Sequence, residues 1–178
     1  AREVQAAIDR LTDRNEKLQT SIEDLTDTIK ASKGTKSVEA YRDAYKYQKE
    51  TNANYLQIAK EQARYSGSHH SWNYYWGGFN QAQIDKLSGQ IGRQWDGNLW
   101  SLSPEEMKAL RSNVDMWTQI QDTGKGGYGG RLTEKLDDYI DQAGKLEELT
   151  DQLYEGLTGI SFDGMYSSFI DNLMNMKY

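Results

Sequence analysis

A glycine-rich stretch in the second half of the chain matches a nucleotide-binding motif. Gly124-x-Gly126-x-x-Gly129 has the spacing of G-x-G-x-x-G, in which backbone N–H groups at a helix N-terminus bind a pyrophosphate. That chemistry needs a preceding strand in a βαβ unit, whereas the residues before Gly124 have helical periodicity. The stretch also lacks the Gly-Lys-Ser/Thr ending of a P-loop. We therefore interpret residues 124–130 as a glycine hinge between two helices and expect no cofactor.

Histidines and paired acids are the other groups that could do chemistry. His69-His70 are the only histidines, and adjacent side chains diverge in a regular element, so without a third ligand they form a poor metal site. Glu105-Glu106 and Asp137-Asp138 are expected on helix surfaces, where neighbouring positions face different ways. The chain has no cysteine, and neither histidine lies in a recognisable catalytic motif. We expect no enzyme activity and no bound metal.

An aromatic group in the middle of the chain could bind sugars or peptides, because exposed indole and phenol rings stack well and lose little entropy. Two interpretations stay open: a platform on the surface, or a small aromatic core in a region with few aliphatic residues. The core is favoured because tryptophan is more often inside. The candidate interaction residues among them are Trp72, Tyr75 and Trp76, and the whole group is Trp72, Tyr74, Tyr75, Trp76, Phe79, Trp95 and Trp100.

The first sixty-six residues have the pattern of a coiled coil, which has apolar residues spaced alternately three and four apart. One polar residue interrupts the seam, and an Asn there is tolerated where it sets register against another polar group. If the chain reverses at Lys33-Gly34, Asn15 faces Asn52 in an antiparallel hairpin over residues 1–66. A parallel dimer is the alternative. The seam comprises Val4, Ile8, Leu11, Asn15, Leu18, Ile22, Leu25 and Ile29.

The second arm of this hairpin is expected to begin at Ser37 as N-cap and to end near Tyr65. Residues 67–102 are expected to form an aromatic-rich cap with a short helix from Asn80 to Ile91. A small β-hairpin is possible at Asp96-Gly97, a favoured two-residue turn. The inward residues of the second arm are expected to include Val38, Tyr41, Tyr45, Gln48, Asn52, Tyr55 and Ala59.

Residues 103–178 are predicted to be a helical region. Ser103, Pro104 and Glu106 meet the needs of a helix start, and that helix is expected to reach Gln121. After the glycine hinge, helical spacing predicts one helix to Leu157, bent at Gly144. The final segment, 161–176, has a wide apolar face that includes Phe169, Ile170 and Leu173, where we expect self-association or binding to other proteins. The fold class is therefore mainly α with little or no sheet.

Charge and composition narrow the function classes. The net charge is −6, and residues 67–178 hold 9 basic against 16 acidic residues, which argues against nucleic-acid binding because that requires a basic face. No stretch approaches the roughly 20 apolar residues that span a bilayer. Because the chain opens with Ala1 and has no stop signal at its end, we interpret it as a fragment of a longer protein.

Four stretches together resemble an internal region of the tail tape-measure proteins of tailed phages and prophages: residues 68–76 (SHHSWNYYW), 100–107 (WSLSPEEM), 136–141 (LDDYID) and 157–163 (LTGISFD). The likeness begins with the coiled coil around residues 9–15 and covers most of the chain. It implies a long helical structural protein, assembled in the bacterial host cytoplasm and packed inside the phage tail of the virion, where its length sets that of the tail. The alternative is a carbohydrate- or peptide-binding module with an aromatic platform on a helical stalk.

Overall fold

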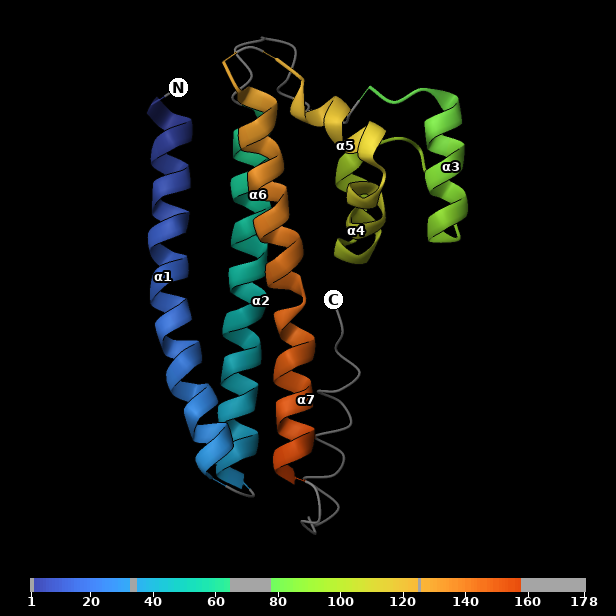
Figure 1. Cartoon of the computed structure of the whole chain (residues 1–178). Coiled ribbons are helices and arrows are strands. Elements are labelled where there is room, and N and C mark those ends of the chain that lie inside the picture. Colours follow the sequence, from blue (N-terminus) through green and yellow to red (C-terminus); the bar gives the residue numbers. More distant parts are fainter. Residues whose placement is uncertain (1, 33–34, 65–77, 125, 158–178) are drawn as a thin grey trace. The chain divides into compact units, whose positions relative to one another are not determined.

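The computed structural model describes residues 2–32, 35–64, 78–124 and 126–157. These residues form helices joined by short connections, and the described part of the chain contains no β-strand (Figure 1). The prediction of a mainly α chain is confirmed.

The chain divides into two compact units. The first consists of Ala1–Leu11 and Tyr55–Asp141, and the second of Thr12–Asn54 and Gln142–Tyr178. This division differs from the expected segments 1–66, 67–102 and 103–178, because the two longest helices each contribute residues to both units.

Helix α1, Arg2–Ala31, buries the face that its heptad spacing predicts. Ile8, Asn15, Ile22 and Ile29 are each 6% exposed or less, as is Leu18. Val4, Leu11 and Leu25 are partly buried at the edge of the same face. The sequence pattern therefore identified the packed side of α1 correctly.

Helix α2, Thr35–Arg64, begins two residues before the predicted N-cap. Ser37 lies inside the helix and is buried, and its hydroxyl donates to the main-chain oxygens of Ile29, at 3.3 Å, and of Ser32. The predicted cap was wrong because a serine within the first turn can satisfy carbonyl oxygens at the end of the preceding helix.

Two faces of α2 are buried, both with heptad-like spacing. We call the face Val38, Tyr41, Tyr45, Gln48, Asn52, Tyr55 and Ala59 the first seam. We call the face Ala40, Ala44, Thr51, Asn54 and Ile58 the second seam. Tyr41 and Gln48 of the first seam bond to Thr150 and Gln142, respectively, whereas Asn54 of the second seam bonds to Asn15 of α1. Small residues at positions 40 and 44 are fully buried, as close helix packing requires.

Local signals set the starts of two short helices in the first unit. Asn80 caps α3, Gln81–Ile91, and Ser103 caps α4, Pro104–Ser112; each forms a capping box with the residue three positions on. Both predicted helix starts are confirmed, because a cap depends on residues within one turn of each other.

The predicted helix from residue 103 to Gln121 is interrupted at Asn113. Helix α4 ends there and α5, Val114–Gln121, follows at once. The buried Asn113 side chain donates to Gln90 Oε1 at 2.7 Å and to the main-chain oxygen of Ala109 at 2.8 Å. The helical spacing of apolar residues continues across Asn113, so the sequence pattern did not reveal that the helix is interrupted there.

The possible β-hairpin at Asp96-Gly97 does not form. Asp96 Oδ1 accepts the main-chain N–H of Asn98 at 2.9 Å, and the Asn98 side chain in turn accepts the N–H of Trp100 at the start of a short 3-10 helix, η2, Leu99–Ser101. Each of these side chains accepts the backbone N–H two residues further on, which stabilises a local turn instead of pairing between two strands.

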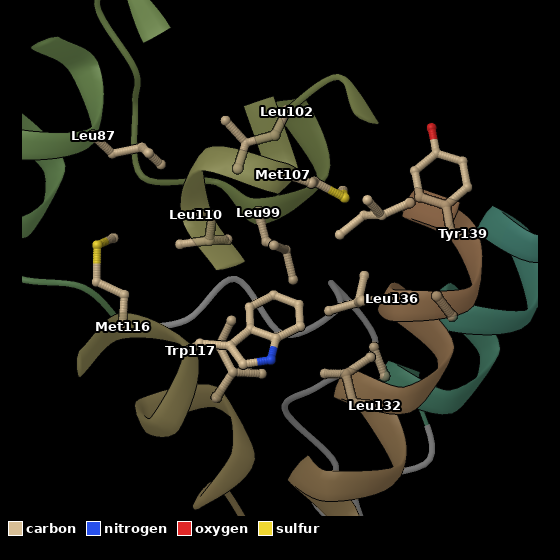
Figure 2. Packing of buried hydrophobic residues seen from close by; sticks show 14 of the residues in the cluster. Leu87, Leu99, Leu102, Met107, Leu110, Met116, Trp117, Leu132, Leu136 and Tyr139 are labelled. Carbon is tan, nitrogen blue, oxygen red and sulfur yellow. The ribbon is translucent and has the colours of Figure 1, made fainter. Parts of the chain in front are cut away.

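The core of the first unit joins these short helices to α6, Tyr128–Ala143. Figure 2 shows Trp117 of α5 with Leu132 and Leu136 of α6, and Met107 and Leu110 of α4 nearby. Ala59 and Ala63 of α2 belong to the same cluster. Helix α7, Lys145–Leu157, begins after Gly144, so the expected bend at this glycine is a break between two helices.

Candidate functional site

Four consecutive positions of the first seam of α2 carry polar atoms. Tyr41, Tyr45, Gln48 and Asn52, which we call the polar seam, are 0%, 3%, 1% and 8% exposed. They lie in the second unit. Tyr41 and Tyr45 belong to its core cluster, together with Ile29 of α1, Val38, Ala40 and Ala44 of α2, and Leu146, Leu149 and Leu153 of α7. Buried polar groups destabilise a core unless they are hydrogen-bonded, so the partners of these four residues decide what the seam does.

Two amides of the polar seam bind the junction between α6 and α7. Gln48 Nε2 lies 2.9 Å from the Asn52 amide and donates to Gln142 Oε1 at 3.2 Å. The Asn52 amide satisfies its surroundings when its nitrogen faces the main-chain oxygen of Gln142 at 3.1 Å. Carbonyl groups in the last turn of a helix have no partner within that helix. An Asn52 amide in that orientation satisfies one such carbonyl, that of Gln142.

The two tyrosines of the polar seam differ in their hydroxyl groups. Tyr41 Oη lies 3.1 Å from Thr150 Oγ1 of α7. Tyr45 Oη is buried and has no hydrogen-bond partner among the described residues, and burial raises the pKa of Tyr45. The rings are 5.7 Å apart and inclined at 44°. Tyr45 thus contributes a ring to the core and leaves one polar atom unsatisfied there.

The residue that pairs with Asn15 is Asn54, not the expected Asn52. Asn54 Nδ2 donates to Asn15 Oδ1 at 2.9 Å, and next to this pair Arg14 Nη2 lies 3.1 Å from Glu50 Oε2. The expected turn at Lys33-Gly34 lies outside the described residues, and the expected face of α2 was wrong. These contacts to α1 come from the side of α2 that carries the second seam, while Asn52 faces α6. The sequence signal for the second seam was the heptad spacing of the small residues Ala40, Ala44 and Thr51, which are buried in the structure.

A groove of about 300 Å³ lies in the second unit between α1 and α7. Its rim carries three acids and two lysines, so no single charge is concentrated there to favour a phosphate or a metal ion. Ile22, Gln48 and Leu149 are its most buried residues. The lining residues are Gln19, Ile22, Glu23, Thr26, Asp27, Lys30, Gln48, Lys145, Glu148, Leu149 and Gln152.

The glycine stretch is a tight turn between α5 and α6. Gly124, Gly126 and Gly127 have φ angles of +77°, +65° and +75°, which favour glycine. A Cβ at Gly129 would lie 2.2 Å from the main-chain oxygen of Ile120, so two helices approach each other too closely there for a side chain. Backbone geometry therefore explains this G-x-G-x-x-G pattern, and the element before it is a helix, not a strand.

Trp95 belongs to the core of the first unit. It is 1% exposed, its indole N–H donates to the main-chain oxygen of Asn98 at 2.8 Å, and its ring centroid lies 5.6 Å from that of Phe79. Trp100 is partly buried and packs against the same cluster. Trp95 is therefore a core residue, whereas Phe79 and Trp100 lie at the edge of that core.

The other candidate residues lie outside the described part of the chain: Trp72, Tyr75, Trp76, Phe169, Ile170 and Leu173, together with His69 and His70. Within the described ranges, no group of three or more His, Cys, Asp or Glu residues is placed to hold a metal ion. No described helix has the length and apolar character to cross a membrane.

Comparisons of the chain with protein-family models, curated proteins and solved structures found no match.

Proposed function

We propose that this chain is a helical structural segment of a phage tail tape-measure protein, located inside the tail and acting in tail assembly and length determination. The observation that carries the proposal is the pair of thirty-residue helices, α1 and α2, with heptad-spaced buried faces. The four stretches of sequence that resemble such proteins support it independently. A chain that works as a ruler needs extended helical segments more than it needs a pocket with reactive groups.

The finer part of the proposal is that α1 and α2 form an antiparallel coiled-coil hairpin. Contacts at two levels support it: Arg14 with Glu50 and Asn15 with Asn54 near the middle of the helices, and Ser37 with Ile29 near the connection between them. Arg14 and Asn15, in the first half of α1, meet residues in the second half of α2, whereas Ile29, late in α1, meets Ser37, early in α2. The short sequence distance between Ala31 and Thr35 favours the same arrangement within one chain over a parallel dimer.

Partners in this proposal are copies of the same chain or other tail proteins. The sequence of residues 161–176 supports it, because apolar residues at helical spacing, among them Phe169, Ile170 and Leu173, are typical of a face that binds another protein. The aromatic platform has less support as an alternative, since Trp95 is buried and its indole N–H is bonded. Alanine at Trp72 or Trp76 tests that alternative: a platform would lose a sugar or peptide ligand while the chain keeps its fold.

Tail length is the direct test of the tape-measure proposal. Residues 2–64 are deleted in frame from the parent gene in its phage, and the tails are measured by electron microscopy. A single extended helix rises 1.5 Å per residue, so the tails should shorten by about 95 Å if this segment is stretched in the tube. They should shorten by about 45 Å, the length of one arm, if it is present as a folded hairpin.

The matched control replaces the same residues with an unrelated helical hairpin of equal length, which should restore the tail length. Tails of unchanged length after the deletion, or particles that lack the protein, would contradict the proposal. A deletion that abolishes tails while the replacement restores tails of a different length would also contradict a ruler role.

A further inference from the structure

Helices α6 and α7 are held in place by different kinds of contact. Leu132, Leu136 and Ile140 of α6 are at most 1% exposed, inside the large apolar core of the first unit. Among the described residues, Leu146, Leu149 and Leu153 of α7 belong to a smaller cluster whose α2 side includes Tyr41 and Tyr45 of the polar seam. Apolar burial is the main source of docking free energy. Helix α7 therefore docks with less of it than α6.

Unsatisfied polar atoms weaken the docking of α7 further. Tyr45 Oη on α2 and Gln152 Oε1 on α7 are buried, and neither has a hydrogen-bond partner among the described residues. A buried polar group without a partner loses its hydrogen bonds to water and gains none in return. Undocking α7 returns both atoms to water, so each of them favours the undocked state.

The break at Gly144 separates α7 from α6 mechanically. Helix α6 ends at Ala143, and α7 begins its own ladder, in which the N–H of Glu148 donates to the oxygen of Gly144 at 3.3 Å. Gln48 Nε2 of α2 holds the side chain of Gln142, so the last turn of α6 has a contact with α2 that does not involve α7. One helix can therefore move while the other keeps its hydrogen bonds.

We propose that α7 is a detachable arm, which undocks from α2 as a unit by rotation at Gly144 and uncovers Tyr41 and Tyr45 while α6 stays docked. This inference does not depend on the proposed role in the phage tail.

Native-state hydrogen exchange on the full chain, read by mass spectrometry of peptides from residues 128–143 and 145–157, tests the arm. A sub-global opening exchanges the amides of one segment before those of the rest of the molecule. We expect the slowest amides of α7 to exchange at least about tenfold faster than the slowest amides of α6, because opening α7 costs less free energy. Equal exchange of the two segments would show one cooperative unit and overturn the proposal.

Two tyrosine variants on the same helix sharpen the test. Tyr45→Phe removes only an unpaired buried oxygen and should slow the exchange of α7 by about tenfold. Helix α6 should slow by no more than this, and only in amides that exchange through global unfolding, because global unfolding also returns this oxygen to water. Tyr41→Phe is the matched control, since its hydroxyl is paired with Thr150, and it should leave the exchange of α7 equal or faster. Unchanged or faster exchange of α7 in Tyr45→Phe, or slowing of α7 by Tyr41→Phe, would contradict the role assigned to these hydroxyls.

Discussion

Arg93 and Glu106 form a two-point ion pair, with Nε 2.6 Å from Oε2 and Nη2 3.0 Å from Oε1. Glu106 is also the N3 residue of the capping box of α4 and accepts the main-chain N–H of Ser103 at 2.9 Å. Arg93 reaches the main-chain oxygen of Ser101 at 3.1 Å. One carboxylate therefore joins the end of α3 to the start of α4.

Glu106 should make the stability of the chain depend on pH below about 5. The hydrogen bonds from Arg93, with the backbone bond from Ser103, lower the pKa of Glu106 from 4.5 to about 2. A group with a lowered folded-state pKa stabilises the fold above its unfolded pKa and loses that contribution as the pH falls through the folded value. The loss should therefore occur between about pH 5 and pH 2.

Glu106→Gln isolates the ion pair, because Gln can still complete a capping box. At pH 7 we expect a loss of about 1 kcal/mol or less in the free energy of unfolding, since the pair is partly exposed and screened by water. Urea unfolding from pH 7 to pH 2 measures it, and the gap between variant and wild type should close at low pH. If the difference in free energy of unfolding between variant and wild type stayed the same from pH 7 to pH 2, the carboxylate charge could not be its cause.

Gly129→Ala should destabilise the chain strongly. The new Cβ would lie 2.2 Å from the main-chain oxygen of Ile120 and 2.5 Å from that of Gln121, so α5 and α6 would have to separate. We expect a loss of about 3 kcal/mol or more, above the usual range for overpacking because both contacts are backbone atoms.

The neighbouring glycine is its control. A Cβ at Gly130 meets nothing within 4 Å, and alanine is the better helix former, so Gly130→Ala should be neutral or stabilise by about 0.5 to 1 kcal/mol. Thermal unfolding of both variants measures the contrast. Equal effects would mean that the approach of the two helices is looser than these distances indicate.

A cysteine pair at Asn15 and Asn54 should form a disulfide within one chain. The two amides touch at 2.9 Å, and the chain has no cysteine of its own to compete. Under oxidising conditions a monomer should run faster on a non-reducing gel than after reduction. Covalent dimers as the main product would favour the parallel two-stranded coil instead.

The same experiment with Asn52 in place of Asn54 is the control for the face of α2. Asn52 faces Gln142, so an Asn15→Cys/Asn52→Cys variant should cross-link more slowly. Faster cross-linking of this pair would restore the register pair that the heptad pattern alone suggested.

Trp95→Phe should cost about 1 to 3 kcal/mol, because the smaller ring leaves space in the core and the oxygen of Asn98 loses the indole N–H. Chemical unfolding measures it. Trp100, which is partly buried, is the comparison, and Trp100→Phe should cost less. A Trp95→Phe variant with wild-type stability would contradict its place in the core.

The sequence alone located the features that depend on near neighbours in the chain. The heptad spacing from Ile8 to Ile29 identified the buried face of α1, because residues three and four apart share one side of a helix. Asn80 and Ser103 marked helix starts, because a cap bonds within one turn. Gly144 marked the end of α6, although the pattern suggested a bend rather than a break.

Tertiary structure decided what depends on partners distant in sequence. Helix α2 carries two seams, and nothing in its own sequence states which of them faces α1. The choice follows from α6 and α7, because Gln142 and Thr150 bond to Gln48 and Tyr41 of the first seam, which leaves Asn54 of the second seam to bond to Asn15. Asn15 therefore pairs with Asn54, because α6 already contacts the face of α2 that carries Asn52. A local sequence pattern cannot show which of two faces another helix will occupy.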